Sequence, residues 1–240
     1  MKHQMLRKKQ RELFSLSDTI KGIIYYLPGD GSLSEIKKIF QQCYRKNAKF
    51  FKREVDKITL TILYDRQEMD EIADYKTQNW VVGYANSSMK NQIYMFSPEV
   101  FGKVSNHHRK EFKPILSHEI AHLFTRSIHK GYKPHWLYEG IACVVAGQKK
   151  LLKNTNMKFT PRIVSLLDTS KQWNRNAAKK SLQGYWQGWK AVDFLMRKYG
   201  KLQLFYFLSS LGDRCNKKIF YAKFRIVYNN DLLEIMKQIR

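Results

Sequence analysis

The segment His118-Glu119-Ile120-Ala121-His122 holds the residue types of a hydrolytic metal site at a fixed spacing. If this segment is helical, the two histidines lie about one turn apart on one face, so both imidazoles can bind a single Zn²⁺. The glutamate between them then points toward water at the metal and can act as a general base. The spacing predicts a zinc site with His118 and His122 as ligands and Glu119 as the base.

The residues around this segment favour a buried helix. The neighbouring positions that would be charged on a solvent-exposed face are uncharged: Ile115, Leu116, Ser117, Ile120, Ala121, Leu123 and Phe124. A glutamate buried between two histidines is costly without a cation. The alternative is an ordinary core helix whose histidines are hydrogen-bonded to carbonyl groups.

A catalytic zinc site needs a third protein ligand and keeps its fourth position for water. The metzincin pattern requires Gly at position 125 and His at position 128, but the sequence has Thr125 and Ile128, so that class is excluded. His129 and His135 are conceivable third ligands.

Glu139 is a stronger candidate for the third ligand. It lies in the segment Trp-Leu-Tyr-Glu-Gly-Ile-Ala, residues 136–142, on a helix that follows the first after a short connection. A short connection makes two helices antiparallel neighbours. Glu139 is one of only two acidic residues between positions 121 and 180, and its neighbours are apolar. A lone carboxylate in such surroundings indicates a bound cation.

Together the two segments resemble the paired motifs of the gluzincin zinc metallopeptidases, the peptidase MA-like domains distantly related to aminopeptidase N and thermolysin. In that family HExxH supplies two zinc ligands and W-L-x-E-G-x-A supplies the third. The resemblance covers roughly residues 57–240. It implies a zinc-dependent peptidase that hydrolyses peptide bonds with metal-activated water, with His118, His122 and Glu139 as ligands and Glu119 as general base.

Two further segments are similar to parts of this family. The family places a β-hairpin edge before the HExxH helix, and residues 83–85 with 93–95 look like it. An extended peptide could add to that edge as a further strand. Tyr185 is similar to the family's oxyanion-stabilising tyrosine, and the other interpretation is a packing residue on a Trp-rich helix. Thermolysin-type enzymes carry an Asp four residues after the Glu ligand, but this chain has Cys143 there.

Periodicity and capping signals predict the elements that must position these residues. Expected strands cover 57–64, 80–85 and 92–96. Expected helices cover 5–20, 32–53 with a capping box at Ser32-Leu33-Ser34-Glu35, 65–75, 108–127, 134–146, 163–167, 182–199, 202–211, 218–228 and 232–239.

This order of elements predicts an α+β protein in three parts. Residues 1–56 form an N-terminal helical extension, residues 57–150 a catalytic subdomain with both zinc motifs, and residues 151–240 a C-terminal helical subdomain. With the resemblance, the expected fold is zincin-like: a small mixed sheet with an edge hairpin packed on the HExxH helix, followed by an all-helical subdomain.

The charge is strongly unbalanced, with 44 Lys and Arg against 20 Asp and Glu and a formal net charge of +24. The excess is distributed over the chain and is missing only from residues 61–120. It predicts an acidic partner, or nucleic acid, in addition to a peptide or protein substrate. The alternative function is a basic nucleic-acid-associated protein with a zinc-peptidase-like fold, acting on DNA-bound proteins or as a non-catalytic interaction module. No zinc-finger pattern, RNP-type aromatic motif or regularly spaced arginine helix supports nucleic-acid binding.

Composition and cysteine usage predict a cytoplasmic protein without a transmembrane segment. No apolar run approaches the roughly 18 residues that a membrane span needs, and the basic N-terminus does not lead into a signal-peptide pattern. The 3 cysteines are far apart and form no CxxC pair, so they are expected to be buried thiols.

Overall fold

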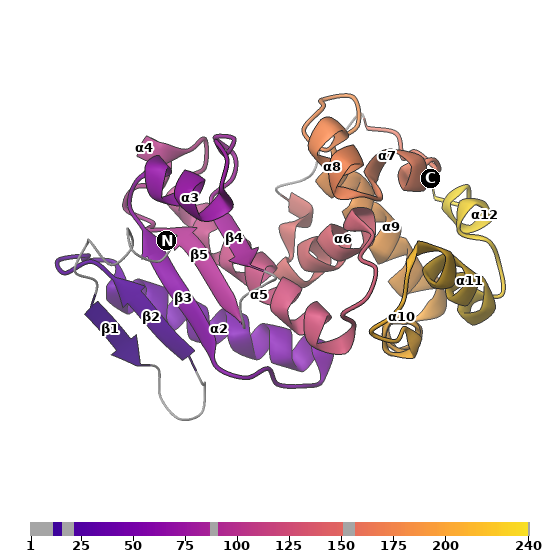
Figure 1. Cartoon of the computed structure of the whole chain (residues 1–240), viewed down its shortest axis with the longest axis horizontal. Helices are drawn as coiled ribbons and strands as arrows, with labels where there is room; N and C mark the ends of the chain where they lie inside the picture. Colours follow the sequence, from indigo (N-terminus) through magenta and orange to yellow (C-terminus); the bar gives the residue numbers. More distant parts are fainter. Residues whose placement is uncertain (1–11, 16–21, 87–90, 151–156, 240) are drawn as a thin grey trace. The chain divides into compact units, whose positions relative to one another are not determined.

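The computed structural model describes residues 12–15, 22–86, 91–150 and 157–239 (Figure 1). The chain divides into two compact units, residues 1–124 and 125–240, with the division inside helix α5. This division does not follow the three parts expected from the sequence, whose boundaries stay a prediction.

The first unit is built on a mixed five-stranded sheet in the order β1-β2-β3-β5-β4. The three central strands are parallel, and each edge strand is antiparallel to its neighbour. The strands are β1 (Glu12–Ser15), β2 (Gly22–Tyr26), β3 (Ile58–Leu63), β4 (Gly83–Asn86) and β5 (Gln92–Phe96). Strands β3 and β5 are buried on both faces along most of their length, as is typical of central strands in a parallel arrangement. The expected mixed sheet with an antiparallel edge pair is therefore confirmed.

Two described segments of the expected N-terminal helical extension, residues 12–15 and 22–26, are strands. Residues 12–15 are a strand instead of part of a helix, and residues 22–26 form β2, which pairs in parallel with β3. The remainder of the helix expected over 5–20 lies outside the described residues. The run Gly-Ile-Ile-Tyr-Tyr is rich in β-branched and aromatic residues, and Ile24 is fully buried in the sheet.

Helix α2 (Leu33–Phe51) confirms the helix expected over 32–53, but its start differs from the expected capping box. The Ser32 side chain makes no cap hydrogen bond to the helix. Instead, the backbone N–H and the hydroxyl of Ser32 both donate to the Asp30 carboxylate. Glu35 pairs with Arg109. In a capping box the Glu35 carboxylate would accept the Ser32 N–H. Here the Asp30 carboxylate, two residues upstream, accepts it.

Helix α2 packs against α5 (Phe112–Ile128), the helix that carries the HExxH segment. The buried Asn47 amide donates to the Ser117 carbonyl over 3.2 Å. Tyr44 and Phe51 pack against Phe124 with ring centroids 5.6 and 5.5 Å away. These contacts lie on both sides of residues 118–122 along α5, so α2 fixes the position and rotation of the segment.

All the regular secondary structure described in the second unit, over residues 125–150 and 157–239, is helical, as expected. Its helices are α6 (His135–Ala146), α7 (Ile163–Leu167), α8 (Ser170–Asn176), α9 (Gly184–Tyr199), α10 (Lys201–Ser210), α11 (Lys217–Tyr228) and α12 (Leu232–Met236). Helix α8 was not expected from the sequence, although Thr169 and Gln172 form a capping box at its start.

Helices α6 and α9 cross at a pair of glycines. A Cβ at Gly140 would lie 2.3 Å from the Gly188 carbonyl oxygen, and a Cβ at Gly188 would lie 2.6 Å from the Trp136 carbonyl oxygen. The two backbones are therefore in direct contact. The crossing fixes α9 against the part of α6 next to Glu139.

We expect Gly140→Ala to destabilise the protein by about 1–3 kcal/mol, because the methyl group forces α6 and α9 apart. Thermal unfolding of the variant measures this loss. Gly102→Ala is the matched control, since a Cβ there meets nothing within 4 Å and Gly102 has no positive φ. Equal melting temperatures for the two variants would contradict the close crossing.

The three cysteines are free and buried, which confirms the expectation from their spacing. Burial raises the pKa of the Cys43 thiol to about 11. Over the described residues, the structure contains no helix that is both long and apolar enough to cross a membrane.

Candidate metal centre

The two histidines of the HExxH segment face the same side of α5. Their ring centroids are 4.8 Å apart and the ring planes are nearly perpendicular, at 83°. His118 is buried, with 6% of its surface exposed, and His122 is half-buried. The helical conformation that this chemistry requires is therefore present.

Glu139 lies in the middle of α6, on a helix that is otherwise almost wholly apolar. Pro134 precedes the first residue of α6, a position where its missing N–H costs no hydrogen bond. Trp136, Leu137 and Ile141 are fully buried, whereas Glu139 is half-buried. The Glu139 carboxylate is the one acidic group of α6.

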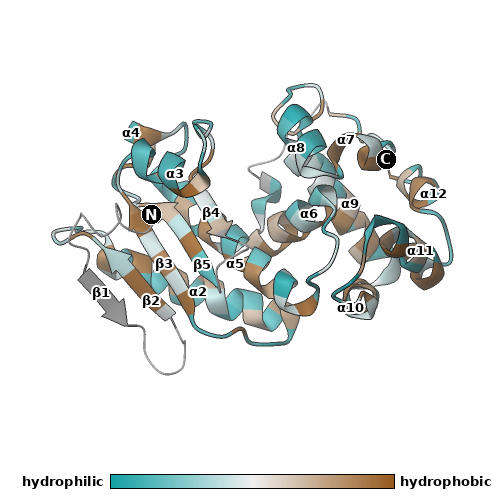
Figure 2. Ribbon diagram, in the orientation of Figure 1, coloured by the Kyte–Doolittle hydropathy of each residue, from teal (hydrophilic) through white to brown (hydrophobic). Residues whose placement is uncertain are grey.

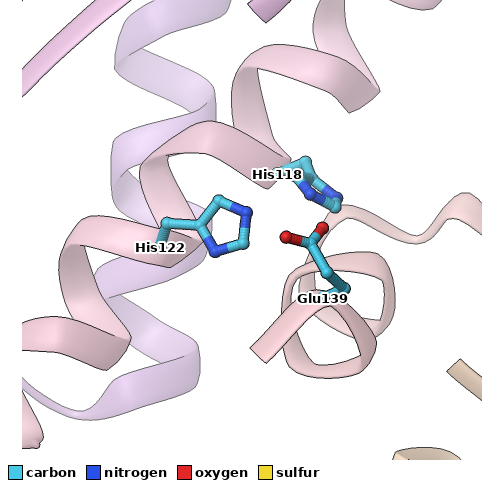
Figure 3. A group of neighbouring side chains, drawn as sticks. All are labelled: His118, His122 and Glu139. Carbon is cyan, nitrogen blue, oxygen red and sulfur yellow. The ribbon is translucent and has the colours of Figure 1, made fainter. Parts of the chain in front are cut away.

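The structure contains a group of three side chains that could hold a metal ion: His118, His122 and Glu139. One ligand atom from each residue lies within 4.8 Å of the other two, and the Glu139 carboxylate points toward the imidazoles (Figure 3). Two imidazole nitrogens and one carboxylate oxygen are the donor set of many catalytic zinc sites. The residues present therefore fit Zn²⁺.

The two other histidines considered as third ligands are engaged elsewhere. The His129 Nε2 donates to the Tyr132 carbonyl over 2.9 Å, and burial lowers the pKa of this imidazole. The His135 Nε2 is hydrogen-bonded to the Ser170 hydroxyl over 2.9 Å, and its ring stacks on Trp173. Among the described residues, neither histidine belongs to the group of side chains that could hold a metal ion.

Edge strand β4 passes directly over the expected general base. A Cβ at Gly83 would lie 2.9 Å from Glu119 Cγ and 3.1 Å from Glu119 Oε1. Any larger residue at this point would require the Glu119 side chain to shift. The glutamate therefore lies against β4, a terminal strand of the described sheet.

We expect Gly83→Ala to lower kcat by about 10- to 100-fold, because the methyl group displaces Glu119 by a fraction of an ångström to an ångström. Metal content should be unchanged, since neither His118 nor His122 is displaced. Steady-state kinetics and elemental analysis measure the two effects, with Gly212→Ala as control because a Cβ there meets nothing within 4 Å. Wild-type kcat in Gly83→Ala would contradict the role given to Glu119.

Arg66, the first residue of α3 (Arg66–Ala73), holds the segment that leads into β4. Its guanidinium donates to the carbonyls of Gln78, Asn79 and Val81, the last over 2.6 Å. It also donates to the Val104 carbonyl at the end of α4 (Phe101–Val104). The strand expected over residues 80–85 is β4 (Gly83–Asn86) in the structure, and the Val81 carbonyl just before it bonds to Arg66.

Tyr185 lies in the first turn of α9, three residues before the glycine crossing with α6. Its ring meets Trp173 edge-on, with centroids 5.0 Å apart. It also packs against the apolar cluster of Cys143, Trp186 and Trp189. These contacts fit its interpretation as a packing residue, and its role toward an oxyanion stays a prediction.

Asp168, which is not among the expected site residues, fixes the start of α6. Asp168 is fully buried, accepts hydrogen bonds from the hydroxyls of Tyr132 and Tyr221, and pairs with Lys217 Nζ over 2.7 Å. Its backbone carbonyl accepts from the His135 N–H, at the first residue of α6. The scarcity of acids between 121 and 180, which singled out Glu139, applies equally to Asp168.

No protein-family model matches the chain, and no curated protein matches it in sequence. Among solved structures, the chain is similar to the M1 zinc metallopeptidase from Deinococcus radiodurans, with 13% identity, coverage of 95% of this chain and 51% of that chain, and a TM-score of 0.49. A mutant of the same enzyme matches with 12% identity, the same coverage of 95% and 51%, and a TM-score of 0.50. The chain thus spans about half the length of these structures.

At this identity the likeness concerns the fold alone. The mixed sheet, the helices and the match at a TM-score of 0.50 support a zincin-like α+β fold. Within this fold, His118, His122 and Glu139 form a group that could bind a metal ion.

Proposed function

We propose that this chain is a zinc-dependent peptidase of the gluzincin type. The observation that carries the proposal is the group formed by His118, His122 and Glu139, whose ligand atoms lie within 4.8 Å of one another. This donor set suits a hydrolytic zinc ion, and Glu119 lies between the two histidines in the sequence, where the HExxH pattern has its general base. The zincin-like fold, with the metallopeptidase structure matched at a TM-score of 0.50, supports the assignment.

When bound, Zn²⁺ would supply the Lewis acidity that polarises the scissile carbonyl and acidifies water. Glu119 accepts a proton from the attacking water as the water oxygen bonds to the carbonyl carbon. Glu119 then returns this proton to the nitrogen as the C–N bond breaks, so the amine leaves neutral. The glutamate ends the cycle as the carboxylate with which it began.

The side of β4 away from β5 is the proposed binding site for the substrate backbone. Strand β4 is the last strand of the sheet and is paired on one side with β5. An extended peptide that adds to its other side is held through backbone hydrogen bonds. Because Gly83 lies against Glu119, such a peptide passes next to the general base.

Tyr185 is the proposed donor to the oxyanion that develops on the carbonyl. Its position on α9, fixed to the Glu139 helix by the Gly140 and Gly188 crossing, supports this role. We expect Tyr185→Phe to lower kcat by about 10- to 1000-fold with little change in melting temperature, because only the hydroxyl is lost. If kcat is unchanged, Tyr185 is a packing residue.

Metal analysis combined with a peptide library tests the proposed function. We expect about one zinc ion per chain, in line with a mononuclear site, and cleavage of internal or terminal peptide bonds. A chelator should stop cleavage and added Zn²⁺ should restore it. Cleavage that persists in the metal-free protein would refute the proposal.

The structure and the comparisons add no observation in favour of a nucleic-acid-associated function. A salt titration of binding to duplex DNA tests that alternative, because phosphate contacts weaken steeply with salt. A cytoplasmic location stays a prediction from the cysteine usage.

A further inference from the structure

All the exposed charged side chains of residues 157–192 are basic. This stretch contains a single acidic residue, Asp168, and seven cations: Lys158, Arg162, Lys171, Arg175, Lys179, Lys180 and Lys190. Asp168 is fully buried and already paired with Lys217 from α11. No carboxylate of this stretch is therefore available at its surface to balance the cations.

Four of these cations lie on α8 or directly after it. Lys171, Arg175, Lys179 and Lys180, here called the α8 basic surface, are all exposed. Lys171 and Arg175 are four residues apart and lie on the same face of the helix. Figure 2 shows α8 as mostly hydrophilic. The positive charges of these side chains repel one another. An anionic ligand bound between them relieves this repulsion and is attracted to the surface.

The opposite face of α8 contacts residues near the proposed active-site residues of the same unit. Trp173 is buried, stacks on His135 with centroids 5.7 Å apart, and meets Tyr185 with centroids 5.0 Å apart. His135 is one helical turn before Glu139 on α6. Lys171 and Arg175 of the α8 basic surface therefore lie on the side of α8 opposite to Trp173, which contacts His135 and Tyr185.

We propose that the α8 basic surface binds acidic side chains of the polypeptide substrate and gives the enzyme a preference for acidic peptides. This inference rests on the proposed peptidase function. A polypeptide is favoured over a nucleic acid because the helix packs on Tyr185 and on the residue one turn from Glu139, where a peptide substrate would lie. Exposed ion pairs act mainly on selectivity and association, so the preference should weaken with salt.

Peptide binding to the Glu119→Gln variant tests the proposal without cleavage. The probes are a fluorescent peptide rich in Asp and Glu and its counterpart of equal length with Asn and Gln, and anisotropy gives each Kd. We expect tighter binding of the acidic peptide. Adding Lys171→Gln and Arg175→Gln should reduce the ratio of the two Kd values by about three- to tenfold.

The matched control carries Lys218→Gln and Arg225→Gln on α11, which remove the same net charge from exposed positions. The control should keep the preference for the acidic peptide. Equal losses in both double variants would mean that only the overall charge matters, and would overturn the proposal. A change in binding to duplex DNA, with no change in the preference for the acidic peptide, would also overturn the proposal.

The failures of the two proposals are distinguishable in this design. If the zinc-loaded wild type cleaves both peptides but the α8 substitutions do not change their relative Kd, the substrate preference is refuted and the peptidase function stands. If the preference depends on α8 but no peptide is cleaved, the peptidase function is refuted and α8 remains a surface for acidic polypeptides.

Discussion

Replacing Glu119 by glutamine is expected to lower kcat for peptide cleavage by about 100- to 10,000-fold while the zinc content is unchanged. The amide has nearly the size of the carboxylate, so it fits against Gly83, where an added Cβ would lie only 2.9 Å from Glu119 Cγ. It cannot accept a proton from water at neutral pH. Steady-state kinetics and elemental analysis of the same preparation measure both parts of the prediction.

Glu35→Gln is the control for this experiment. Glu35 is also in the first unit, and it pairs with Arg109 at the surface. Its loss should leave kcat at the wild-type value, because exposed ion pairs contribute little. Wild-type cleavage by Glu119→Gln would mean that another group takes the proton, and the mechanism above would be wrong.

Removing a metal ligand has the second large expected effect. Glu139→Ala and His118→Ala should each weaken zinc binding by more than about 100-fold, a loss larger than that seen when only a ligand's hydrogen-bond partner is removed. Competition with a chromophoric chelator measures the zinc Kd. The zinc-dependent rise in melting temperature should disappear as well, because a ligand bound only to the folded state stabilises it by mass action.

The variants His129→Ala and His135→Ala separate the ligand assignment from a general effect of losing a histidine. His129 and His135 are bonded to the Tyr132 carbonyl and to the Ser170 hydroxyl. Both variants should therefore retain zinc with a near wild-type Kd. Loss of zinc from either of them, with retention in Glu139→Ala, would show that the third ligand was assigned wrongly.

The helices of the site could be predicted because their signals are local. The apolar stripe of α5 and the Pro134 start of α6 lie within each helix, so the HExxH helix and the Glu139 helix were placed nearly correctly. The residue spacing then specified the donor set without reference to the fold.

The first strands of the sheet could not be predicted in the same way. Strand β2 is stabilised by parallel pairing with β3, more than 30 residues later in the chain, and β1 is paired with β2. A local residue pattern does not reveal pairing with a distant strand, and the pattern of residues 5–20 favours a helix. Strand propensity depends on the partner strands more than helix propensity depends on neighbouring helices.

Parts of the site also depend on contacts between distant segments. The contact of Gly83 with Glu119 and the crossing of Gly140 with Gly188 join residues far apart in the sequence. A glycine inside a helix or strand suggests that another segment lies close to its backbone. The sequence does not show which segment that is. The start of helix α8, in contrast, has a local signal in the sequence, because Thr169 and Gln172 form a capping box.

Anomalous diffraction at the zinc absorption edge, from crystals of the protein grown with Zn²⁺, tests the central claim most directly. We predict one strong peak at about 2.0–2.2 Å from a ring nitrogen of His118, a ring nitrogen of His122 and a carboxylate oxygen of Glu139. A zinc peak at other residues, or no peak at these three in fully zinc-loaded protein, would contradict the account.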